Sequence, residues 1–245
     1  MDLYARVNIL DRKAVRLPTG DVTDAISLDA DPIERARGWV AKGADRLHIV
    51  DLDAAAYGDY ENRSLIAELI AAVDVPVQVA GGIRTPGEVE RILGFGAWRV
   101  VMGTAAIEDQ VMIWDVCRDH PDKLAVSLDV RPDEELAIRG WRADSGRFME
   151  EVLIELSSAG VASFMVAEAG RDALKAQTNL GILRRAIGFV AESVIASGGA
   201  RDIDDLNALV DLETDGRRLG GIVVGREITE GRFTMKQARA ATNTE

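Results

Sequence analysis

The sequence VAGGIRTPGEV at residues 79–89 returns in the second half of the chain as ASGGARDIDDL at residues 196–206. Two glycines and an arginine keep their places 117 residues apart, since Gly81, Gly82 and Arg84 correspond to Gly198, Gly199 and Arg201. Self-similarity at a fixed separation is the signature of a repeated fold unit. It indicates that the chain is made of two similar halves.

Further matches follow in the same order along the chain. Asp51 ends LHIVD and Glu168 ends FMVAE, again 117 residues apart. Gly103 and Gly225 follow similar apolar runs at a separation of 122, and VNI at 7–9 resembles LDV at 128–130 at a separation of 121. The boundary falls near residues 119–123, where no Gly-, Ser- or Pro-rich linker separates the halves. We therefore predict one domain over residues 1–245, with halves of about 1–120 and 121–245.

Short apolar runs alternate with longer segments of helical periodicity. The expected strands are Tyr4–Leu10, Arg46–Asp51, Pro76–Ala80, Arg99–Met102, Leu124–Asp129, Ser163–Ala167, Val194–Ala196 and Gly221–Val224. The expected helices are Asp31–Lys42, Arg63–Ala72, Pro86–Leu93, Gln110–Arg118, Phe148–Ser157, Leu180–Val190 and Ile203–Leu212. Strands that alternate with helices are typical of a parallel sheet with crossover connections. Eight such strands favour closure into an α/β (β/α)8 TIM barrel, made of two repeated (β/α)4 halves.

The composition narrows the class of protein and its partners. The 245 residues match the usual size of such a barrel, and 47% hydrophobic content supports a large core. A net charge of −12 argues against nucleic acid and anionic membranes as partners. One cysteine and two histidines are too few for a His/Cys metal cage, and no apolar run could span a membrane. We expect a cytoplasmic monomer.

Glycine turns follow the third, fourth, seventh and eighth expected strands. Glycine lets the backbone approach an oxyanion closely, and a following helix offers free N–H groups. The turns after strands 7 and 8 form the usual phosphate site of these barrels, and the repeat then places a second site after strands 3 and 4. The alternative is that the glycines only relieve tight turns. The candidate phosphate-binding residues are Gly82, Gly103, Thr104, Ser197, Gly198, Gly199, Gly225 and Arg226.

Six motifs carry a family resemblance: AVRL at 14–17, LHIVDLDAA at 47–55, GGIR at 81–84, LDVR at 128–131, RGW at 139–141 and ASGG at 196–199. They resemble the phosphoribosyl isomerases of histidine biosynthesis, including an actinobacterial branch that also isomerises phosphoribosylanthranilate. The resemblance implies an Amadori rearrangement of an aminoaldose to an aminoketose, without cofactor or metal. It also implies a histidine-pathway substrate with a phosphate at each end, in agreement with the two predicted phosphate sites.

This chemistry needs an acid for the ring oxygen and a base for a carbon-bound proton. The resemblance places the base, an aspartate in the family, at Asn8, which cannot accept a proton. Asp11 is a poor substitute, because strand residues an odd number apart face opposite sides. Asp129 and Asp172 match the family's two proposed acids, and the sequence leaves open which of them donates. The loop around Asp172 lacks the family's Thr-Asp and Asp-Gly-Thr pattern, which puts turnover in doubt.

Three further residues match substrate-contacting places in the family. Arg16 follows the first strand, and Arg139 and Trp141 lie on the long loop after the fifth. An arginine can bind a carboxylate or phosphate with two hydrogen bonds, and an indole can stack on a planar ring. The alternative is that Trp141 only packs its loop on the barrel.

Three functions follow from these observations. The first is aldose–ketose isomerisation of the two-phosphate aminoaldose of histidine biosynthesis, with Asn8 leaving this chain poorly active or inactive. The second is dual or exclusive action on phosphoribosylanthranilate in tryptophan biosynthesis, suggested by RGW at 139–141. The third is a sugar-phosphate binder without catalysis, suggested by Asn8. In each case the expected partner is a small sugar phosphate.

Overall fold

The computed structural model describes residues 1–18, 20–28, 30–170 and 179–243. Eight parallel strands in this part of the chain form a closed ring, because the β10–β7 pairing joins the two ends of the sheet. Their sequences are almost continuously apolar, as expected for strands covered on both faces. The ring consists of β1 (Asp2–Leu10), β4 (Arg46–Asp51), β5 (Val77–Ala80), β6 (Arg99–Met102), β7 (Leu124–Val130), β10 (Ser163–Glu168), β11 (Ser193–Ser197) and β14 (Gly221–Val224).

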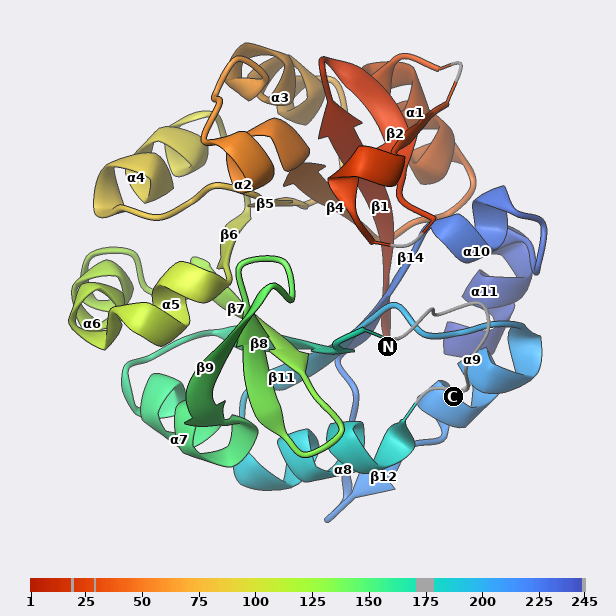
Figure 1. Ribbon diagram of the computed structural model, residues 1–245. Coiled ribbons are helices and arrows are strands. Elements are labelled where there is room, and N and C mark those ends of the chain that lie inside the picture. The colour runs from red at the N-terminus through yellow and green to blue at the C-terminus, as the bar shows by residue number, and fades with distance from the viewer. Residues whose placement is uncertain (19, 29, 171–178, 244–245) are drawn as a thin grey trace.

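Helices surround the ring of strands (Figure 1). Several begin where a side chain caps the free N–H groups of the first turn, as Asp31, Thr85 and Asp202 do. The main outer helices are α1 (Pro32–Ala41), α3 (Arg63–Ala71), α4 (Pro86–Gly94), α6 (Gln110–Asp119), α7 (Met149–Ser158), α8 (Leu180–Phe189), α9 (Ile203–Val210) and α11 (Met235–Thr242). The predicted TIM barrel is confirmed, and each predicted helix overlaps an observed one.

Shorter elements were missing from the sequence prediction. In each half, the first strand of the ring runs on into an antiparallel hairpin at the mouth of the barrel, where Asn8 lies opposite Val15 and Asp129 lies opposite Ala137. The additional elements are β2 (Lys13–Arg16), η1 (Val22–Asp24), β3 (Ile26–Ser27), α2 (Leu52–Tyr57), α5 (Thr104–Glu108), β8 (Glu135–Ile138), β9 (Ala143–Phe148), β12 (Glu213–Thr214), β13 (Arg217–Arg218) and α10 (Arg226–Thr229). The loops of these hairpins lie around the mouth of the barrel.

Two apolar regions stabilise the barrel. The larger region lies between the strands and the outer helices, and the smaller one fills the barrel interior. The interior residues are Tyr4, Val101, Ala125, Met165, Ile195 and Val223. Because strand side chains alternate between the two faces, Arg6 and Asn8 on β1 point inward above Tyr4. The apolar interior therefore closes the barrel below a polar mouth.

A buried ion pair fixes the connection from β4 to β5. The Arg63 guanidinium lies 3.0 Å from the Asp51 carboxylate and donates a second hydrogen bond to the Gly81 carbonyl at 3.0 Å. Burial raises the pKa of Asp51, whereas the hydrogen bonds from Asn62 and Ala54 and the charge of Arg63 lower it. Gly81 has a positive φ of 100°, and a Cβ there would lie 2.1 Å from the Asp51 carbonyl oxygen. Close packing therefore requires glycine at this position, whether or not a ligand binds nearby.

We expect Arg63→Ala to lower the free energy of unfolding by about 3–5 kcal/mol, because it leaves the buried Asp51 carboxylate without its cation. Urea denaturation followed by circular dichroism measures the change. Arg118→Ala is the matched control, since Arg118 on α6 makes exposed ion pairs and its loss should leave stability almost unchanged. Equal, small losses for the two variants would contradict the stabilising role of Arg63.

Candidate active site

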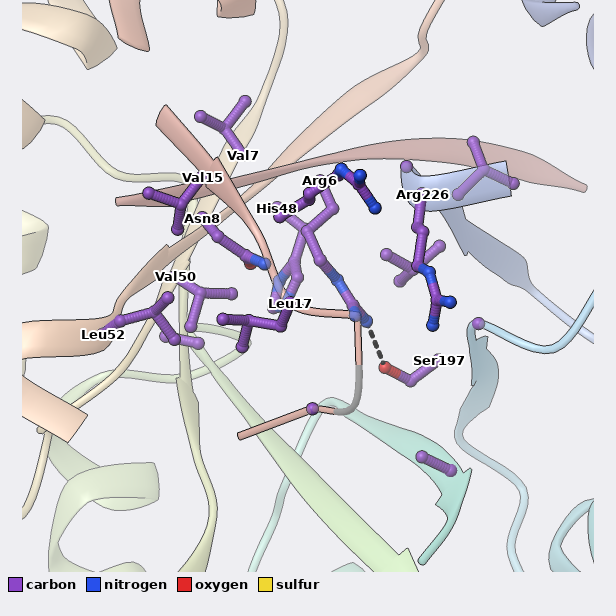
Figure 2. Close-up of a pocket in the computed structure, with 18 of the residues that line it drawn as sticks. Arg6, Val7, Asn8, Val15, Leu17, His48, Val50, Leu52, Ser197 and Arg226 are labelled. Atoms are coloured by element: carbon purple, nitrogen blue, oxygen red, sulfur yellow. Dashed lines mark hydrogen bonds between the residues drawn. The ribbon is translucent and has the colours of Figure 1, made fainter. Parts of the chain in front are cut away.

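A cavity of about 420 Å³ opens at the carboxyl ends of the barrel strands. Its wall combines inward-facing strand residues with residues of the loops around the mouth. The strand residues include Arg6, Asn8, His48, Val50, Ala80, Val101, Ser127, Asp129, Ala167, Glu168, Ser197 and Val223. The loop residues include Arg16, Gly20, Gly140, Trp141, Gly198, Gly225, Arg226 and Glu227. Figure 2 shows part of this wall, with Asn8, His48 and Arg6 projecting from neighbouring strands.

Asn8 and Asp129 line the same cavity from β1 and β7. Burial raises the pKa of Asp129, whereas a hydrogen bond from Trp141 and the positive charge of Arg6 lower it. A carboxyl group with its pKa raised by burial retains its proton to higher pH and is suited to act as an acid. Asp11 lies outside this wall on the turn after β1, where its exposed carboxylate pairs with Lys13.

Trp141 closes one side of the cavity. It follows β8 with a positive φ of 68°, and a Cβ on Gly20 would lie 3.0 Å from the indole ring. The loop after β7 and the loop after β2 therefore meet over the mouth. Trp141, predicted as a substrate contact, lies on the cavity wall.

Four of the predicted phosphate-binding residues, Ser197, Gly198, Gly225 and Arg226, lie on the cavity wall, after β11 and β14. The Arg226 guanidinium donates to Glu230 at 2.9 Å and to the Pro18 carbonyl at 2.5 Å, and Arg16 pairs with the same Glu230 at 3.0 Å. Gly199 follows Gly198 but does not line the described wall.

The corresponding turns of the first half, which contain Gly82, Gly103 and Thr104, lie outside the described wall. A Cβ on Gly82 would lie 2.5 Å from that of Ala54, so tight packing against α2 also requires this glycine. Arg139 lies beside the other turn: its backbone N–H donates to the Thr104 hydroxyl at 2.9 Å, and its exposed guanidinium pairs with Glu108. Asp172 lies outside the described residues.

Arg6 and Glu227 are two of the charged wall residues that were missing from the sequence prediction. Arg6 donates to the Ser197 hydroxyl at 2.9 Å, and the Glu227 carboxylate accepts from the Gly225 N–H at 3.0 Å. Arg6 stands two residues before Asn8, at the strand spacing that gives both side chains the same face. This spacing is the feature of the sequence from which the position of Arg6 at the site could have been predicted. Glu227 gives no comparable signal, since a glutamate in the first turn of a helix is common.

His48 lies below Asn8 in the barrel interior. Burial, with a smaller effect from the Arg6 charge, lowers the pKa of His48 to about 3, so the ring is neutral near pH 7. Its Nδ1 lies 3.0 Å from the Gln78 side-chain amide. His48 therefore contributes an uncharged side chain to the bottom of the cavity.

Two features are absent from the described residues, a membrane-spanning helix and a cluster of metal ligands. No helix there has the length and apolar character needed to cross a membrane. The same part of the chain brings together no group of three or more His, Cys, Asp or Glu side chains that could hold a metal ion.

Comparison with known proteins gives a match over nearly the whole chain. Residues 2–234 match the family model described as "Histidine biosynthesis protein". The chain belongs to this family. A protein of Saccharopolyspora erythraea is 40% identical over 98% of both chains, and one of a Picosynechococcus species is 36% identical over 97% of this chain and 92% of its own. Both are named as isomerases of an imidazole-4-carboxamide that carries two phosphoribosyl groups. A protein of Streptomyces griseus, 39% identical over 98% of both chains, is named phosphoribosyl isomerase A.

Family membership confirms the class expected from the six motifs. This member of the histidine biosynthesis family is a phosphoribosyl isomerase, in the class of intramolecular oxidoreductases. Its barrel mouth combines Asp129 with asparagine at position 8, and it places Arg6 and Glu227 on the wall beside them.

Proposed function

We propose that this protein is an aldose–ketose isomerase of an aminoaldose phosphate, with turnover limited by Asn8. The observation that carries the proposal is one cavity at the barrel mouth that contains Asp129, Asn8 and the glycine turns after β11 and β14. Incubating the protein with an aminoaldose and following ketose formation by NMR tests it. No conversion by this protein, nor by a variant with an aspartate at position 8, would instead support a non-catalytic sugar-phosphate binder.

The proposed reaction begins with groups on the cavity wall. Asp129 protonates the ring oxygen, which opens the sugar to an imine, and the raised pKa of Asp129 favours the protonated form that this step needs. The Trp141 indole, which donates to Asp129, holds the carboxyl group in place. Asn8 can position the opened substrate by hydrogen bonding but cannot remove its carbon-bound proton. Water must then remove that proton slowly.

Two substrates remain candidates for this reaction. The names of the relatives favour the two-phosphate aminoaldose of histidine biosynthesis. Trp141 favours phosphoribosylanthranilate, because its indole lies on the cavity wall, where it can stack on an aromatic ring. The Streptomyces griseus relative named phosphoribosyl isomerase A is consistent with either substrate.

We expect Arg139→Ala, combined with Asn8→Asp, to lower kcat/KM for phosphoribosylanthranilate roughly 10–100-fold, and to lower that for the two-phosphate substrate less. The Arg139 guanidinium pairs with an exposed glutamate, a weak interaction that a ligand carboxylate can replace. Loss of one charge-assisted hydrogen bond has an effect of this size. Steady-state kinetics with both substrates measures the ratio, and an equal fall for both would show that Arg139 only shapes its loop.

A further inference from the structure

In the second half of the chain, the Glu227 carboxylate lies at the glycine turns for which the sequence predicts a phosphate site. Its Oε2 accepts the Gly225 N–H at 3.0 Å, and a Cβ placed on Gly198 would lie 4.0 Å from its Oε1. The side chain is 4% exposed. The carboxylate therefore lies between the two glycine turns and takes up a backbone donor that a phosphate would use.

Comparison of the two halves of the internal repeat shows that only the second half has an acid at this position. At the separation that aligns Gly103 with Gly225, Glu227 corresponds to Ala105. At the separation that aligns Asn8 with Asp129, Arg6 corresponds to Ser127. The turns of the first half thus have small residues at both places, Ala105 on α5 and Ser127 on the neighbouring strand β7. Position 105 therefore has no counterpart of the Glu227 carboxylate.

Arg6 provides the nearby positive charge. Figure 2 shows its side chain crossing the mouth to the Ser197 hydroxyl, which accepts its hydrogen bond at 2.9 Å. Burial lowers the pKa of Arg6, and the negative charges of Glu227 and Asp129 act in the opposite direction. Both side chains line the cavity. A phosphate dianion at this turn would meet the Glu227 carboxylate and compete with it for Arg6.

We propose that Glu227 takes the place of a ligand phosphate, so that this protein selects a sugar with one phosphate and an uncharged, hydroxyl-bearing end at the β11–β14 turns. This inference rests on the proposed function and specifies its substrate class. The single phosphate then binds at the turns of the first half, where Ala105 stands at the position of Glu227 and where Arg139, whose guanidinium pairs with Glu108, contacts Thr104 through its backbone N–H.

Titration with inorganic phosphate, followed by backbone amide NMR, tests the inference without measuring turnover. In the unmodified protein we expect the Gly103 amide to shift on phosphate binding and the Gly225 amide to stay unchanged. In Glu227→Ala, which copies the residue of the first half, both amides should shift, and the apparent Kd at Gly225 should fall at least about tenfold. Glu227→Gln keeps the shape without the charge and should change binding in the same direction.

Arg6 supplies an internal control. Once Glu227 is removed, the freed Arg6 should bind the phosphate, so Arg6→Ala combined with Glu227→Ala should lose most of the gain at Gly225. A Gly225 shift of equal affinity in the unmodified protein and in both Glu227 variants would overturn the proposal. The absence of any shift at Gly103 would overturn the assignment of the single phosphate to the first half. Neither result depends on whether the protein catalyses isomerisation.

Discussion

Replacing Asn8 by aspartate is expected to raise the rate of isomerisation roughly 10²–10⁴-fold, the usual contribution of a general base. Asn8 lines the cavity from β1, between Val15 on the neighbouring hairpin strand and Val50 on β4. An aspartate has the same shape, so the backbone needs no adjustment. The new carboxylate would remove the carbon-bound proton that the asparagine cannot accept. Ketose formation under single-turnover conditions measures the gain.

The pH profile separates a general base from a merely electrostatic effect. With an aspartate at position 8, the rate should rise with pH until that base is deprotonated. It should fall again above the pKa of Asp129, which burial raises, because the acid then loses its proton. Asn8→Ala is the control and should show no gain. Equal rates for the original and the Asn8→Asp protein would mean that position 8 does not contact the reacting carbon.

Replacing Asp129 by asparagine in the Asn8→Asp protein should remove roughly 10²–10⁴-fold of the restored rate, because no acid then protonates the ring oxygen. Asparagine can still accept the hydrogen bond from Trp141, so the loop over the mouth should remain in place. We expect kcat to fall with little change in KM, since the lost interaction forms in the transition state. Steady-state kinetics on the purified variants measures both constants.

Asp11→Asn is the matched control for this variant. Asp11 carries the same charge, but it is exposed on the turn after β1 and pairs with Lys13. Its replacement should leave both kinetic constants unchanged. If Asp129→Asn retained the full rate, the acid would have to be another group, and Asp172 would be the first to examine.

Periodicity predicted the ring strands well. The bounds predicted for β4, β6 and β14 agree with the structure, because short β-branched runs covered on both faces leave a clear pattern. The hairpins at the mouth were missed because strands such as Lys13–Arg16 have mixed polarity and lack the continuous apolar run of the ring strands.

The site was predicted less completely than the fold. Asn8, Asp129, Trp141 and the turn at Gly225 line one cavity, as the internal repeat and the family motifs suggested. The roles of Arg6 and Glu227 depend on side chains that meet across the barrel, since Arg6 contacts Ser197, 191 positions away in the chain. Distances of this kind follow from ring closure and leave no local pattern in the sequence.

The difference between Glu227 and Ala105 gives the barrel mouth a direction. A barrel built from two identical halves would receive an elongated ligand equally well in either orientation, and half of its encounters would place the wrong carbon beside the acid. With a buried carboxylate between the glycine turns at one end, we expect the two orientations to differ in energy, so that binding itself aligns the sugar. A duplicated scaffold would thereby distinguish head from tail in its ligand.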